Sequence, residues 1–224
     1  MNRSVGFDFT SAVSTDGHDI AQIFGSAGND FLEANASHTT LTSGGNVYDV
    51  SGFQRVNVVA GAGGTDVAIL NGTENTDRVY LDANGTSLST EQGLNRAVGF
   101  DEYIVHGNGG LDSATLVGSD GDDRLHSNGT TTTLESAGSQ FTINDFQNQR
   151  FDGKAGFDVV SLEGFDEDDL LEGDELNLRS AIDETTLSAT NFSFLNAATD
   201  LVSRYDMSTV DYLFMLDGVW EEVE

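Results

Sequence analysis

A repeat with a period of about 46 residues constrains the fold of this chain more than any other feature of its sequence. The segment 61–72, GAGGTDVAILNG, aligns without a gap with the segment 107–118, GNGGLDSATLVG. A third copy covers 153–164, and a fourth, weaker at its start, covers 14–25. Tandem repeats of this kind are typical of solenoids, in which each unit buries its apolar side against its neighbours.

Single residue types recur in columns at the same step, and these columns set the bounds of the units. The units are about 14–60, 61–106, 107–152 and 153–172 onward, and a degenerate terminal repeat, predicted to be a cap, occupies 173–224. Terminal repeats of solenoids are atypical because they cover the end of the stack. The columns are Asp19, Asp66, Asp112 and Asp158; Asp30, Asp77, Asp123 and Asp169; Leu41, Leu88 and Leu134; and Phe7, Phe53, Phe100 and Phe146.

Short runs of β-branched and aromatic residues alternate with clusters of Gly, Asp, Asn and Ser in every unit. This texture predicts many short strands that are joined by tight turns. The 26 glycines and the absence of proline fit such turns, because glycine adopts the backbone conformations that they need. Around the unit 107–152 the expected strands are 101–105, 113–117, 124–126, 131–136 and 140–146.

The sequence predicts an all-β fold, a parallel β-solenoid or β-helix of about four 46-residue repeats with a degenerate C-terminal capping repeat. Two arrangements fit one unit: two coils of about 23 residues, or one coil that carries a hairpin over 131–146. A string of small β-sandwich domains is the competing fold, although such a unit is short for an independent core. In a solenoid the recurrent phenylalanines should lie in the core, and the column from Asp19 to Asp158 should stack in one line.

The charge balance limits the partners of the chain. With 38 Asp and Glu against 9 Lys and Arg, the formal net charge is −29, so we expect no binding to nucleic acid or to anionic membranes. There is no cysteine, and no apolar run is long enough to span a bilayer. The sequence opens within a repeat and without an apolar signal segment, so we expect a piece of a longer chain whose export signal lies outside it.

Two turns carry a glycine and aspartate pattern. They read GSAGNDFL at 25–32 and GSDGDDRL at 118–125, and the segment 61–70 follows the pattern more loosely. The pattern resembles the nonapeptide of RTX, or haemolysin-type, calcium-binding proteins. In that family tandem nonapeptides form a β-roll whose turn oxygens bind calcium, a cation that prefers about six to eight oxygen ligands. Here the copies are isolated rather than back to back.

The resemblance implies Ca²⁺ as the cofactor and turn residues as its ligands. The alternative is that each aspartate makes an Asx turn and binds no ion. Two copies depart from the pattern, because 72–77 lacks the second glycine and 164–169 has an acidic residue in its place. The candidate ligands are Asn29, Asp30, Asp66, Asp77, Asp112, Asp120, Asp122, Asp123, Asp158 and Asp169.

The unit as a whole, over residues 5–172, resembles the tandem repeats of very long secreted proteins of aquatic bacteria such as planctomycetes. This resemblance implies a bacterial protein that is secreted or lies on the cell surface. The partners that it implies are other domains of a longer parent chain, with a surface polysaccharide or another cell-surface protein.

No catalytic motif occurs in the sequence. It contains no Gly-x-Ser-x-Gly, phosphate-binding loop or zinc motif, and the four histidines share no ligand spacing. We therefore predict a non-catalytic extracellular structural or adhesive module rather than an enzyme. The alternative is a carbohydrate-binding or carbohydrate-active β-helix similar to polysaccharide lyases, which would need a polar cluster that does not follow the repeat.

Overall fold

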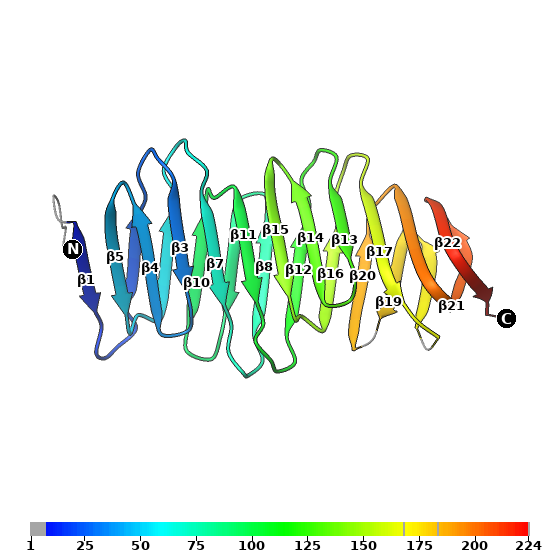
Figure 1. The fold of residues 1–224 in the computed structure, drawn as a ribbon, viewed down its shortest axis with the longest axis horizontal. Coiled ribbons are helices and arrows are strands. Elements are labelled where there is room, and N and C mark those ends of the chain that lie inside the picture. The colour runs from blue at the N-terminus through cyan, green and yellow to red at the C-terminus, as the bar shows by residue number, and fades with distance from the viewer. Residues whose placement is uncertain (1–7, 168, 183, 224) are drawn as a thin grey trace.

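The protein is an elongated rod of β-strands. The computed structural model describes residues 8–167, 169–182 and 184–223. Every regular element within these residues is a strand, and they include no helix that is long and apolar enough to cross a membrane. The strands lie side by side along the rod, with the two termini at opposite ends (Figure 1). The predicted all-β solenoid is confirmed.

The strands form one hydrogen-bonded sheet that is folded into two opposed faces, which we name the β1 face and the β2 face after their first strands. The chain winds from one face to the other, so that strands from successive turns become parallel neighbours. The β1 face has the order β1 (Phe9–Val13), β5 (Asn46–Ser51), β4 (His38–Ser43), β3 (Asp30–Ala34), β7 (Val67–Asn71), β11 (Glu102–His106), β15 (Ser139–Asn144), β14 (Thr131–Ser136), β13 (Arg124–Ser127) and β17 (Val159–Phe165). The β2 face has the order β2 (Ile20–Phe24), β6 (Arg55–Val59), β10 (Leu94–Val98), β9 (Gly85–Ser89), β8 (Arg78–Asp82), β12 (Ser113–Val117), β16 (Asn148–Asp152), β20 (Thr185–Thr190), β19 (Asn177–Ile182) and β18 (Leu170–Glu175).

Two longer strands join the faces at the C-terminal end of the rod. β21 (Phe194–Val210) pairs through its first part with β17 on the β1 face and through its last part with β18 on the β2 face. β22 (Leu213–Glu222) pairs in parallel with both parts of β21. The segment 173–224, predicted to be a degenerate cap, thus continues the stack of strands.

Each unit makes one three-stranded antiparallel meander. In the unit 107–152, β14 pairs antiparallel with β13 on one side and with β15 on the other. The predicted hairpin over 131–146 is found, but neither predicted number of coils is. Within the unit 107–152, β12 lies on the β2 face, the meander on the β1 face and β16 on the β2 face again, so that three passes make one and a half turns. The competing string of β-sandwiches is wrong, because parallel pairs join successive units without a break. The other meanders are β3–β5, β8–β10 and β18–β20, and they alternate between the two faces.

The meanders make the spatial period of the rod differ from the period of its sequence. Ser113 on β12 lies opposite Arg78 on one side and Asn148 on the other, which are both 35 positions away. Residues one sequence unit apart lie instead on opposite faces, because successive meanders alternate. Equivalent residues of neighbouring units are therefore not neighbours in space.

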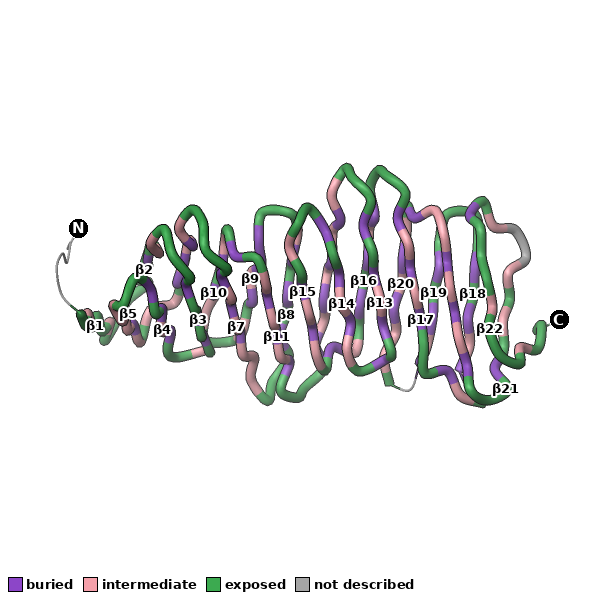
Figure 2. Tube along the Cα trace, turned by 45° about the horizontal axis from the view of Figure 1, so that its top comes forward, coloured by how far each residue is buried: buried purple, intermediate pink, exposed green. Residues whose placement is uncertain are grey.

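The core lies between the two faces. On β12, for example, Ala114 and Leu116 are buried while Ser113, Thr115 and Val117 are partly exposed. The same alternation recurs on the strands between the two ends of the rod (Figure 2), whereas β1 and β22 have no buried residue. Phe53 is partly buried against this core, and Phe7 lies outside the described residues. The other two phenylalanines of the column, Phe100 and Phe146, are buried, and so are Leu41, Leu88 and Leu134 of the leucine column.

Polar bridges cross this core in two places. Thr132 on β14 donates its hydroxyl to Gln149 Oε1 on β16 at 2.6 Å, and it accepts from the hydroxyl of Ser127 at 2.7 Å. Two units earlier, Thr39 on β4 and Asn95 on β10 make the equivalent contact at 3.4 Å. Because each bridge joins the β1 face to the β2 face, it fixes one face relative to the other.

Candidate functional site

The buried acidic side chains of the protein lie at the turns, where the chain enters a strand. A buried carboxylate is costly unless hydrogen bonds or opposite charges compensate it. The hydrogen bonds of these residues therefore indicate what they do. Seven aspartates share the position and are at most 5% exposed: Asp30, Asp66, Asp77, Asp112, Asp123, Asp158 and Asp169.

Carboxylates from one turn accept hydrogen bonds from the backbone of the turn before it. Asp158 Oδ1, just before β17, accepts the backbone N–H of Asp123, just before β13, at 2.8 Å. Because β13 and β17 are parallel neighbours, this bond joins two adjacent turns at one edge of the rod. We call such a contact a rung. Equivalent rungs, both of 2.7 Å, join Asp66 to Asp30 and Asp112 to Asp77.

We call a series of rungs at one edge of the rod a ladder, and in two of the three ladders a third residue extends the series by one more turn. Asp101 Oδ2 accepts the backbone N–H of Asp66, and Gln147 Oε1 accepts that of Asp112, both at 2.8 Å. At the N-terminal end Gln54 Oε1 accepts the N–H of Asp19 at 2.9 Å. A neutral amide oxygen and a carboxylate oxygen thus serve equally as the acceptor of a rung.

The first aspartate of a ladder binds its own turn. Asp123 accepts the backbone N–H of Ser119 at 2.6 Å and its hydroxyl at 3.0 Å. One residue earlier, Asp122 Oδ1 accepts the N–H of Phe157 in the next turn at 2.8 Å. Asn29 makes the same contact with Thr65 at 3.0 Å. Adjacent turns are therefore tied in both directions.

The structure brings the candidate ligands together in three groups and leaves two of them apart. Asp120 is exposed, and Asp169 accepts the N–H of Asp166 at 2.8 Å. The predicted line from Asp19 to Asp158 is wrong, because its successive members enter strands on opposite faces. The three groups are Asn29, Asp30 and Asp66; Asp77 and Asp112; and Asp122, Asp123 and Asp158.

A glycine five residues before the aspartate makes room for its carboxylate. A Cβ on Gly153 would lie 2.6 Å from Asp158 Oδ2 and would also meet the backbone oxygen of Asn191 in the next turn. A Cβ on Gly118 would meet Asp123 Oδ2 in the same way. Neither glycine has a positive φ. The glycine is thus needed for close approach, and glycine and aspartate form one structural unit.

Burial raises the pKa of the rung aspartates. For Asp158 desolvation is the largest effect, the hydrogen bond from the N–H of Asp123 opposes it, and the charges of Asp123 and Asp122 add to it, so that the pKa rises to about 6. Desolvation also raises the pKa of Asp66 and of Asp112. Ionisation of the second aspartate of each ladder therefore opposes folding.

These groups do not form the oxygen cage that calcium prefers. Within the described residues no three acidic or histidine side chains converge on one point. The oxygens of Asp123 and one oxygen of Asp158 face N–H or O–H donors, which a cation would have to displace. Asp112 Oδ2 is buried without a hydrogen-bond partner, but a single oxygen is not a site. Calcium binding stays a prediction.

Sequence reasoning missed three further acceptors of backbone N–H groups at the turns. Gln54, Asp101 and Gln147 recur at the same step as the aspartate columns, so a signal was present. The mixture of amide and acid concealed it, because a search for calcium ligands selects carboxylates. The common property is a side-chain oxygen that accepts an N–H, which both residue types provide.

No protein-family model, no curated protein and no solved structure matches this chain.

Proposed function

We propose that the chain is a non-catalytic structural module, a stiff spacer within a longer extracellular bacterial surface protein. The rungs are the observation that carries this proposal. They place buried aspartates where a side chain fixes one turn of the rod to the next, rather than where side chains could converge on a substrate. An elongated shape with its termini at opposite ends suits a spacer.

The rungs support stiffness because they act at the turns, in addition to the backbone hydrogen bonds that pair the strands. A backbone N–H at the entry of a strand would otherwise be buried without a partner, and leaving it so costs about 1–3 kcal/mol. Each rung satisfies that N–H with an oxygen from the following turn. The position of one turn is thereby coupled to the position of the next, along both edges of the rod.

The rigidity of the rod can be tested by a distance measurement between its two ends. The chain has no cysteine, so spin labels on Gln22→Cys and Glu221→Cys would be the only ones. Both positions are exposed, on β2 and on β22. We expect pulsed electron spin resonance to give one narrow distance distribution in the presence and in the absence of calcium.

The same labels test the contribution of the rungs. Asp66→Ala with Asp158→Ala removes two acceptors, and we expect a broader distribution with the same mean. Asp120→Ala, an exposed turn aspartate, is the control and should leave the distribution unchanged. A broad or multiple distribution in the unmodified chain would refute a stiff spacer.

A further inference from the structure

The positive charges of this acidic protein are gathered on one side of the rod. The chain has 9 Lys and Arg. Of those in the described part, only Arg124 lies on the β1 face, and Lys154 lies in the turn after β16. The remainder lie on strands of the β2 face with exposed side chains: Arg55, Arg78, Arg96, Arg150, Arg179 and Arg204.

The spacing of these arginines is regular. From β10 onward an arginine occurs on every second strand of the β2 face, on β10, β8, β16, β19 and β21. Neighbouring strands are about 4.8 Å apart, so successive arginines are spaced by about 10 Å along the rod. They occupy two rows across the strands: Arg96, Arg150 and Arg179 lie in the row of Thr115, and Arg78 and Arg204 lie in the row of Ser113, two positions away. The 46-residue repeat does not produce this order, because the strands of the β2 face come from different positions in their units.

Four of these six arginines have no side-chain partner among the described residues. His38 pairs with Asp49, and His126 with Glu163. Arg78, Arg96, Arg150 and Arg179 make neither an ion pair nor a side-chain hydrogen bond there. Arg179 lies directly opposite the exposed Glu172 on β18 without forming an ion pair with it. Arginines that form no ion pair keep their donors available to a ligand.

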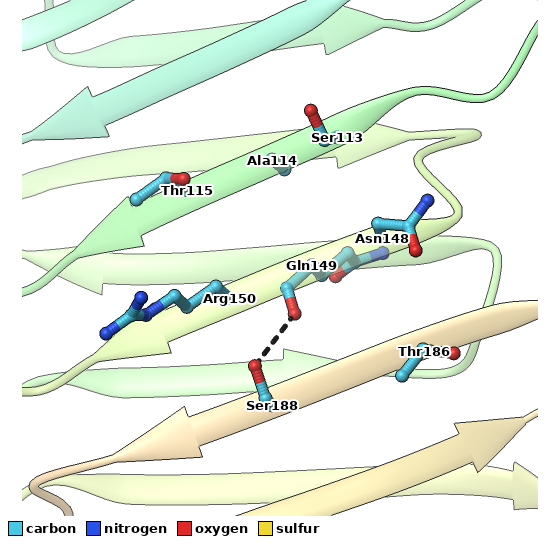
Figure 3. Close-up of a pocket in the computed structure, with 8 residues that line it drawn as sticks. All are labelled: Ser113, Ala114, Thr115, Asn148, Gln149, Arg150, Thr186 and Ser188. Carbon is cyan, nitrogen blue, oxygen red and sulfur yellow. Dashed lines mark hydrogen bonds between the residues drawn. The ribbon is translucent and has the colours of Figure 1, made fainter.

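The groups between the arginines are small and polar. Thr115 lies directly opposite Arg150, which lies opposite Ser188, which in turn lies opposite Arg179. Figure 3 shows Thr115, Arg150 and Ser188 on three adjacent strands of this face, around an open hollow of about 280 Å³. Tyr80 adds one exposed aromatic ring. The face therefore offers a line of charged and neutral hydrogen-bonding groups.

This composition favours a polysaccharide over a protein as the ligand. The centre of a protein interface is apolar and depleted of charge, whereas the line through Arg96, Ser87, Tyr80, Thr115, Arg150, Ser188 and Arg179 contains one aromatic residue and no aliphatic one. Arginine binds carboxylate and sulfate-like groups through two parallel hydrogen bonds, and hydroxyls and amides can bind sugar hydroxyls.

We propose that the β2 face binds a linear polysaccharide that carries carboxylate or sulfate groups, laid along the rod with its anionic groups on successive arginines. Binding at this face does not require the spacer role proposed above.

The test is the affinity for polygalacturonate and for dextran sulfate, with neutral dextran as the uncharged control, measured by interferometry at low and at high salt. The variant is Arg150→Gln with Arg179→Gln. Its matched control is Arg124→Gln with Lys154→Gln, which removes the same charge from outside the β2 face. Both should keep the circular dichroism of the unmodified protein, since all four side chains are exposed.

We expect at least one of the two anionic polymers to bind, neutral dextran not to bind, and salt to weaken the binding. The Arg150 and Arg179 variant should bind about tenfold more weakly, and the control within about twofold of the unmodified protein. Binding of polygalacturonate alone identifies the carboxylate as the ligand, and binding of dextran sulfate alone the sulfate.

Any of the following results would overturn the proposal: no binding of either polymer, an equal loss in the control variant, equal binding of neutral dextran, or tighter binding of single-stranded poly(dT). Self-association that is lost in the Arg150 and Arg179 variant would also overturn it, by assigning the β2 face to a second copy of the chain.

Discussion

At the scale of the residue, the aspartates of this protein are acceptors for backbone N–H groups. Asp158 shows the balance of effects. Its carboxylate completes a rung with Asp123, yet the side chain is buried and has two acidic neighbours. A neutral acceptor would complete the rung without the cost of the charge, as Gln147 does for Asp112.

The raised pKa of Asp158 predicts a dependence of stability on pH. Because its pKa rises from 3.8 to about 6 on folding, the protonated form is favoured in the folded state. The contribution of the protonated Asp158 carboxyl to the free energy of unfolding is complete below about pH 4, and it is lost as the pH rises through about 6. We expect the melting temperature to fall between pH 5 and pH 7, and Asp158→Asn to raise it at pH 7 by about 2–4 °C.

The control for this experiment is Asp120→Asn, which removes the same charge from an exposed turn position. It should shift the melting temperature less and leave its slope with pH unchanged. A lower melting temperature of Asp158→Asn at pH 7 would mean that the rung needs the ionised carboxylate, and would contradict the assignment.

At the scale of the element, the meander is the feature that shapes the rod. The sequence predicted its strands well, since 113–117 and 131–136 are the observed bounds of β12 and β14. The sequence left open whether the hairpin strands 131–136 and 140–146 belong to a second coil, because both arrangements bury Leu134 and Phe141 equally. The decision depends on pairing between distant strands, which no local pattern encodes.

The polar bridge of β14 gives a prediction for the meander. Thr132→Val keeps the shape of the side chain but removes the hydroxyl that Gln149 Oε1 accepts. The buried oxygen would lose its donor, so we expect the free energy of unfolding in urea to fall by about 1–3 kcal/mol. Thr133→Val, on the outer side of the same strand, should change it by less than about 0.5 kcal/mol. Equal effects of the two variants would show that the bridge adds nothing.

At the scale of the whole molecule, the net charge of −29 makes the rod repel itself, and cations relieve this repulsion. The arrangement of the rungs leads us to expect that calcium and magnesium, at equal millimolar concentration, raise the melting temperature by the same amount relative to a chelator. A rise selective for calcium would make the turn aspartates ligands. One saturated site, at a hundred times its dissociation constant, adds about 2.7 kcal/mol.

The assembly of the ladders could not be predicted from the sequence columns. Asp66 and Asp112 occupy equivalent positions in their units, and nothing in the residues around them indicates that they lie on opposite faces. The partner of Asp66 is Asp30, 36 positions before it. This offset of 36 positions can be recognised only once the meander is known to stay within one face. The grouping of arginines on the β2 face could not be predicted either, because the face of each strand also depends on the meanders.

The alternation of meanders has a consequence for the number of units that such a rod holds. One unit moves the next meander to the opposite face, so two units are needed to return to the same side. A rod that lost the residues 61–106 would carry Arg55 and Arg150 on different sides, whereas loss of an even number of units would preserve the sides. Duplication in pairs would therefore lengthen the arginine-bearing surface, and duplication of one unit would divide it.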